Sequence, residues 1–115
     1  MSNVIIQVSD MDRSIDFYEG ILGLSVQGRG GDFVFLDAGA VTLVLAPVES
    51  HVDPGDTEIV LEVSDIDETH ARLAAQVDFR IAPRPVTQAG DRILHAADFR
   101  DPDGHILSIT GWKQA

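Results

Sequence analysis

Two glutamates, Glu58 and Glu62, are candidates for ligand binding or acid–base catalysis in this sequence. Apolar residues alternate with them through Glu58–Val63, so on a strand both carboxylates would share one face. Carboxylates in apolar surroundings are costly unless paired or protonated. They could bind a ligand's ammonium or guanidinium group, Glu58 could act as a general base, or they could form salt bridges with Arg92 or Arg84. The sequence leaves these three uses open.

The four histidines are the remaining donors of interest, because the chain has no cysteine. That absence excludes disulfides, thiolate metal ligands and cysteine nucleophiles. His51 lies in a segment rich in proline and glycine, His70 in an expected helix, and His105 beside a tight turn, so surface roles are expected for these three. His95 lies in an apolar run and is an acid/base candidate together with Glu58.

The composition limits the class of protein. A net charge of −11, from 19 acidic and 8 basic residues, disfavours nucleic acid and favours cationic ligands. No apolar run approaches the roughly 20 residues needed to cross a bilayer, and residues 1–7 do not read as a signal peptide. With 115 residues, we expect one soluble, cytoplasmic domain without a membrane partner.

An internal repeat indicates the strands and helices on which these side chains lie. Val8–Asp12 recurs as Val63–Asp67, displaced by 55 residues. Each copy ends an alternating strand pattern and begins a helix that Asp10 or Asp65 would cap. Three strand-like runs follow each helix, the second set interrupted by Pro83 and Pro85 and by the turn 101–104: Leu24–Val26, Phe33–Asp37, Val41–Ala46, then Phe79–Ala82, Ile93–Phe99, Ile106–Thr110. The predicted fold class is α+β, with two tandem βαβββ modules at 1–47 and 57–115 and a linker at 48–56.

Two of these segments resemble a known family. Val8–Leu24 is similar to the first-helix motif of glyoxalase I, bleomycin resistance proteins and their relatives, and Phe99–His105 resembles their closing hairpin. The resemblance to this vicinal oxygen chelate superfamily covers nearly the whole chain. It implies that each module curls its mixed sheet into half of a cup, with the ligand inside and the helices outside.

The resemblance also implies four positions for metal ligands in those members that use a metal. In this sequence they fall at Asn3, Val44, Glu58 and Ser108. A divalent transition metal usually needs three or more imidazole or carboxylate donors, and only Glu58 is a strong donor here. We therefore expect no metal and no cofactor.

Strand alternation predicts which side chains line such a cup. Val4, Ile6 and Val8 should face the helices, and their neighbours the cup. A two-residue hairpin around Ala38–Gly39 and another at Pro102–Asp103 would place residues of the neighbouring strands on the same two faces. The aromatic residues could sandwich a planar ligand or serve ordinary packing at a dimer interface. The predicted ligand-binding residues are Asn3, Ile5, Gln7, Phe33, Phe35, Val44, Glu58, Val60, Glu62, His95, Phe99, Ser108 and Trp112.

The missing metal donors, the aromatic lining and the acidic balance favour a metal-independent small-molecule binding protein without catalytic residues. The resemblance to bleomycin resistance proteins implies that it sequesters a planar or cationic antibiotic, as a homodimer. The alternative is a lyase, isomerase or dioxygenase-like enzyme of the same superfamily, using Glu58 and His95 as acid and base or a non-standard metal site. A third possibility is a structural or regulatory partner whose cup is vestigial.

Overall fold

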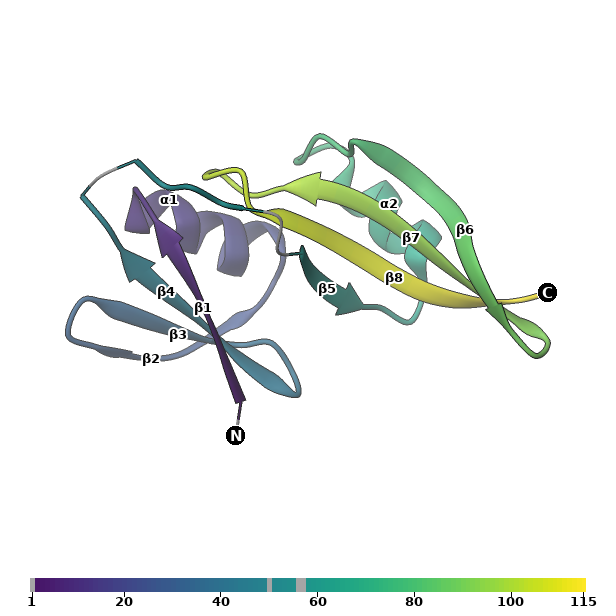
Figure 1. The fold of residues 1–115 in the computed structure, drawn as a ribbon, viewed down its shortest axis with the longest axis horizontal. Helices are drawn as coiled ribbons and strands as arrows, with labels where there is room; N and C mark the ends of the chain where they lie inside the picture. Colours follow the sequence, from purple (N-terminus) through teal and green to yellow (C-terminus); the bar gives the residue numbers. More distant parts are fainter. Residues whose placement is uncertain (1, 50, 56–57) are drawn as a thin grey trace. The chain divides into compact units, whose positions relative to one another are not determined.

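Two four-stranded sheets, each with its own helix, make up the fold in the computed structural model, which describes residues 2–49, 51–55 and 58–115 (Figure 1). Contacts divide the chain into two units, Met1–Pro54 and Gly55–Ala115. The first unit contains β1 (Ser2–Val8), α1 (Met11–Ile15), the π-helical segment η1 (Asp16–Ile21), β2 (Ser25–Gly30), β3 (Phe33–Asp37) and β4 (Val41–Pro47). The second contains β5 (Glu58–Glu62), α2 (Ile66–Leu73), β6 (Ile81–Ala89), β7 (Arg92–Arg100) and β8 (Ile106–Gln114).

The two sheets have the same topology. Their strand orders are β1-β4-β3-β2 and β5-β8-β7-β6. The first strand of each unit pairs in parallel with the last, and the other neighbours are antiparallel. This arrangement confirms the prediction of two tandem βαβββ modules in mixed sheets. None of the helices in the described ranges is long and apolar enough to cross a membrane.

Both helices begin as the repeat predicts. Asp10 and Asp65 have nearly identical extended backbones, with φ −138° and ψ 102° at the first and φ −138° and ψ 98° at the second. The Asp10 carboxylate accepts the Arg13 amide at 3.2 Å, and the Asp65 carboxylate accepts the Glu68 amide at 3.0 Å. Each aspartate therefore satisfies an amide that the first helical turn leaves without a partner.

The first helix changes its winding after one turn. In η1, the Leu22 amide donates to the Phe17 carbonyl at 3.0 Å, five residues back. Phe17 and Tyr18 are both buried, with ring centroids 5.1 Å apart. Two neighbouring aromatic side chains of η1 therefore both contribute to the core.

Each sheet has one face that packs on its helix and one that does not. In the first sheet, the pairs Leu36–Leu43 and Val34–Leu45 are buried beside Ile6, and α1 contacts β4. In the second, α2 contacts β6, β7 and β8, as can be followed in Figure 1. We call these the helix-bearing faces, and the opposite ones the helix-free faces. The alternation of apolar residues along each strand produces the two faces.

Three strands are longer than expected: β2 reaches Gly30, β6 reaches Ala89 and β8 reaches Gln114. The segment with Pro83 and Pro85 was expected to separate two strands, yet β6 runs through it from Ile81 to Ala89. The register against β7 shifts on either side, between Ile81 and Arg84 and again after Pro85. Because β6 is the edge of its sheet, prolines without amide hydrogens are tolerated at these irregularities.

Candidate functional site

The helix-free face of the first sheet carries the predicted residues of that module. Asn3 pairs with Thr42, and Val44 lies between Ile5 on β1 and Phe35 on β3. The bond from the Ala38 amide to the Val41 carbonyl, at 3.1 Å, closes a two-residue turn. Strand pairing thus puts one set of predicted residues on a single face: Asn3, Ile5, Gln7, Phe33, Phe35 and Val44.

Glycines in β2 make room for an aromatic ring on this face. Gly28 pairs with Phe35, and a Cβ atom at Gly30 would come within 3.2 Å of the Phe35 ring. Phe33 is 45% exposed and Ile5 is 66% exposed. The face therefore presents apolar side chains to its surroundings, beside the amides of Asn3 and Gln7.

The helix-free face of the second sheet carries both glutamates. Glu58 pairs with Ile106, Val60 with Ser108 and Glu62 with Thr110, and Trp112 lies further along β8 on the same face. Val60 is 55% exposed, whereas Ser108 is buried. Both glutamates are exposed, so the cost expected for buried carboxylates does not arise.

His95 and Phe99 lie on the helix-bearing face, contrary to the prediction. His95 pairs with Gly111 and Phe99 with Leu107, whereas the helix-free face holds Asp98 opposite Ser108. Phe99 is fully buried against Phe79, with ring centroids 5.3 Å apart.

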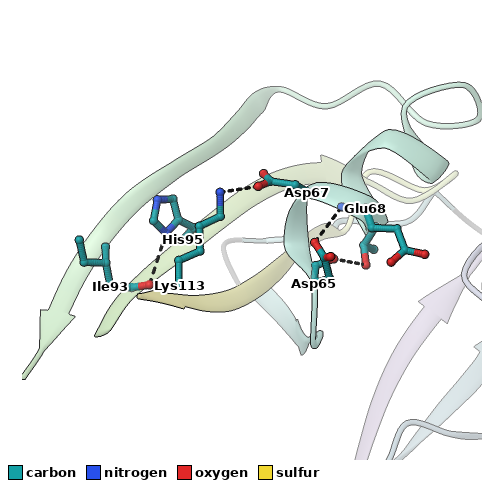
Figure 2. A network of polar contacts seen from close by, with 7 residues as sticks. Asp65, Asp67, Glu68, Ile93, His95 and Lys113 are labelled. Atoms are coloured by element: carbon teal, nitrogen blue, oxygen red, sulfur yellow. Dashed lines mark hydrogen bonds and ion pairs between the residues drawn. The ribbon is translucent and has the colours of Figure 1, made fainter. Parts of the chain in front are cut away.

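Figure 2 shows His95 on the side of α2, next to the Lys113 ammonium that donates to Asp67. The His95 Nδ1 atom lies 3.3 Å from the Ile93 carbonyl oxygen. Glu58 and His95 therefore lie on opposite faces of one sheet, and the acid/base pair of the enzyme hypothesis is not assembled.

The turn between β7 and β8 explains this error. The Asp101 amide donates to the His105 carbonyl at 3.0 Å, which leaves three residues in the loop where two were expected. The Asp101 carboxylate accepts the amides of Asp103 and His105 at 3.0 and 2.8 Å and fixes that geometry. A shift of one residue exchanges the two faces of a strand.

With the corrected register, Leu94, Ala96 and Asp98 take the helix-free positions of β7. Asp98 pairs with Arg84 of β6 at 3.9 Å, and Arg84 also donates to the Ala96 carbonyl at 3.2 Å. The sequence reasoning missed Asp98 for this face. The signal that could have placed Asp98 on this face is Asp101, because an aspartate at that position favours a turn of three residues.

A pocket forms where β5 ends beside a longer neighbour. The Val63 amide still donates to the Thr110 carbonyl at 2.8 Å, but β8 continues to Gln114. The pocket has a volume of about 390 Å³ and is lined by Glu62, Val63, Ser64, Arg92 and Trp112. The Arg92 guanidinium carbon lies 4.7 Å from the centroid of the Trp112 ring, in cation–π contact.

The structure does not have the salt bridges that would neutralise Glu58 and Glu62 with arginine. In the part of the chain that is described, no ion pair joins Glu58 or Glu62 to Arg84 or Arg92. Arg84 pairs with Asp98 instead, and Arg92 lies over Trp112.

The four positions that the family resemblance assigns to metal ligands do not fit a divalent metal. Val44 has no donor atom, Ser108 offers a hydroxyl and Asn3 an amide, so Glu58 is the single carboxylate. Within residues 2–49, 51–55 and 58–115, no group of three or more His, Asp or Glu side chains could hold a metal ion. The chemistry of these donors does not support Lewis-acid catalysis at those positions.

The first unit also has a pocket, with a volume of about 440 Å³. It lies between the start of α1, the β2–β3 turn and the end of β4. Of the predicted binding residues, Phe33 alone lines it; the other lining residues are Met11, Arg29, Gly31, Asp32, Val34, Pro47, Val48 and Glu49.

Comparison with known protein sequences gives one relative without an assigned function and one named as an enzyme. An uncharacterised protein from Mycolicibacterium smegmatis is 38% identical over 73 residues, which are 63% of this chain and 62% of that protein. The matched stretch thus spans less than two thirds of that relative. Metallothiol transferase FosB from Lysinibacillus sphaericus is 28% identical over 120 residues, with 99% of this chain and 84% of that protein covered.

Comparison with solved structures gives the fold. A protein from the mobile metagenome of V. Pseudocholerae superposes with a TM-score of 0.83 at 21% identity, over 99% of this chain and 95% of that one. TnmS3, an antibiotic binding protein from Streptomyces sp. CB03234, superposes with a TM-score of 0.75 at 22% identity, over 98% and 95%. Residues 1–109 match the model of the Glyoxalase/Bleomycin resistance protein/Dioxygenase superfamily. The chain therefore belongs to the glyoxalase, bleomycin resistance protein and dioxygenase superfamily.

Proposed function

We propose that this protein binds a small organic molecule without a metal and sequesters a planar or cationic antibiotic. Its superfamily includes an antibiotic binding protein of the same fold and a relative named as a metallothiol transferase. A shared fold does not choose between binding and catalysis, so the choice rests on the side chains of the site.

The exposed face of β5 carries the proposal. Val60, 55% exposed, lies between two exposed carboxylates, Glu58 and Glu62. An apolar side chain flanked by anionic groups suits a ligand with an apolar body and a positive charge. The net charge of −11 adds a long-range attraction for such a ligand.

The enzyme alternative loses its acid/base pair. A substrate on the helix-free face of the second sheet would reach Glu58 but not His95, which points toward α2 on the other face (Figure 2). General acid–base catalysis requires both groups within hydrogen-bond reach of the reacting atoms. Binding is therefore the function that the geometry supports best.

Trp112 makes this proposal measurable, because it is the single tryptophan of the chain and lies on the same face as the glutamates. The purified protein, before and after dialysis against EDTA, is titrated with bleomycin, mitomycin C and a planar cationic dye, with Trp112 fluorescence as the signal. Saturable binding at micromolar concentration, unchanged by EDTA, supports the proposal. A stoichiometric transition metal whose removal abolishes binding contradicts it.

The variant Glu58→Gln tests the role of charge. Because Glu58 is exposed, we expect the affinity for a cationic ligand to fall only about two- to fivefold, as for exposed ion pairs. The affinity for an uncharged ligand and the folding stability should be unchanged. Glu68→Gln on α2 is the matched control, since it makes the same change in net charge away from this face. Equal losses in both variants would remove Glu58 from the site.

The homodimer expected for this family is part of the same proposal. Ile5 and Val60 leave apolar side chains exposed on the two helix-free faces, and such surface is often covered by a partner. Sedimentation velocity at micromolar concentration tests it directly. A monomer with full ligand affinity would show that the second copy is not needed for binding.

A further inference from the structure

The pocket at the end of β5 is a feature of the second unit that duplication of the fold does not explain. In the first unit, β1 and β4 end together, with Val8 paired to Pro47. In the second unit, β5 ends at Glu62 while β8 runs on past Thr110 to Gln114. The extra length of β8 places the half-buried Trp112 beyond the end of β5, where it lines the hollow.

Two opposite charges line this hollow without neutralising each other. Glu62 reaches it from β5 and Arg92 from β7, and the described residues show no ion pair between them. Both side chains are exposed, so neither charge is desolvated in the free protein. The carboxylate can accept hydrogen bonds from a ligand, and the guanidinium can donate them.

Arg92 stacks on the ring of Trp112 and does not pair with Glu62 in the described part of the chain. The guanidinium carbon of Arg92 lies 4.7 Å from the centre of the indole ring, where the cation is attracted to the ring. A guanidinium stacked in this way keeps its N–H groups available for a planar carboxylate, which it can bind through two parallel hydrogen bonds. Ser64 lines the same pocket and adds a hydroxyl group.

From these observations we infer that the pocket takes a zwitterionic ligand of the amino-acid type. Its ammonium group binds Glu62, its carboxylate binds Arg92, and its apolar body packs beside Trp112. The inference rests on the proposed function, because it names the class of ligand for the same helix-free face. The pocket volume of about 390 Å³ suits a molecule of that size.

Three compounds with one common body test this assignment. L-phenylalanine carries both charges, phenethylamine only the positive one and 3-phenylpropionate only the negative one. The titration follows the NMR signal of the Trp112 indole N–H, which is unique because the chain has one tryptophan. We expect L-phenylalanine to bind about two- to fivefold more tightly than either singly charged compound, since each exposed charged pair contributes separately.

Variants separate the two charges. Arg92→Gln should reduce the affinity for L-phenylalanine to that for phenethylamine and leave the latter within about twofold, whereas Arg92→Lys should keep part of the preference. Glu62→Gln should do the same relative to 3-phenylpropionate. Arg72→Gln on α2 is the matched control for the loss of a positive charge, because Arg72 is exposed and outside the pocket.

Two results would overturn the inference. One is equal affinity of the wild-type protein for all three compounds, and the other is an equal effect of Arg92→Gln and Arg72→Gln. If cationic drugs still bind in either case, the ligand class is wrong and the proposed function stands. If no drug of the panel binds either, both are wrong.

Discussion

At Gly111 the backbone of β8 lies close to the start of α2, so Gly111→Ala tests that packing directly. A Cβ atom at Gly111 would lie 3.0 Å from the Ile66 Cβ atom, 3.3 Å from the Val63 carbonyl oxygen and 3.4 Å from the Ile66 amide nitrogen. Carbon atoms pack best at about 3.5–4.0 Å, so the start of α2 must move away from β8 by about 0.5–1 Å.

The size of the effect follows from two opposing contributions. Forcing an extra methyl group into a packed core costs about 1–3 kcal/mol. Replacing glycine by alanine restricts the unfolded chain and returns about 0.4–1 kcal/mol. We expect a net loss of about 1–2 kcal/mol in the free energy of unfolding, or about 4–8 °C in Tm for a chain of this size.

Gly20→Ala provides a matched control of opposite sign. Gly20 lies in η1, has no atom within 4 Å of an added Cβ atom, and has no positive φ. Alanine there should raise the free energy of unfolding by about 0.5–1 kcal/mol. Urea unfolding followed by circular dichroism and Trp112 fluorescence measures both variants. A Gly111→Ala protein as stable as the wild type would refute the contact between Gly111 and Ile66.

Two further predictions concern polar groups of the second unit. The Lys113 ammonium, hydrogen-bonded to Asp67, lowers the pKa of that carboxyl below its ordinary value of 3.8. The Asp67–Lys113 pair should therefore stabilise the fold above pH 3.8 and lose this effect as the pH falls further. Asp67→Asn should abolish that part of the pH dependence of the free energy of unfolding, measured by urea unfolding between about pH 3 and 6. An unchanged profile would contradict the pairing. Asp101→Ala should cost about 1–3 kcal/mol in thermal or urea unfolding, because the amides of Asp103 and His105 lose their buried acceptor. A loss below about 0.5 kcal/mol would show that water replaces the carboxylate.

The features predicted correctly from the sequence are those that local interactions determine. Asp10 and Asp65 each cap a helix through a carboxylate three residues from the amide it accepts, so the sequence alone contains both partners. The alternation in β1 and β5 depends only on which residues are apolar. The repeat then predicted that both modules have the same order of strands and helix, and the two sheets do share one topology.

The errors arose where one residue decides the outcome. His95 and Phe99 were placed on the wrong face because the loop that begins after Asp101 has three residues where two were assumed. The pocket beside Trp112 was missed because it depends on how far β8 extends beyond the end of its neighbour β5 at Glu62. Strand ends and turn lengths are set by pairing with distant segments, and the sequence pattern does not specify them.

The two glutamates of β5 can act independently, which connects the two proposals for this face. They are four residues apart on one strand, about 13 Å at the usual rise of a β-strand. That separation exceeds the screening length of about 8 Å at physiological salt, so they repel each other little and their effects on binding should add. Asn3 and Gln7 occupy the equivalent positions in β1, so the first module has an amide where the second has each carboxylate, within the same sheet topology. A small zwitterion in the Trp112 pocket should therefore respond to Glu62→Gln alone, whereas a larger cationic drug that covers Val60 should respond to both Glu62→Gln and Glu58→Gln. A loss of L-phenylalanine binding in Glu58→Gln would show that the two ends of β5 form one site.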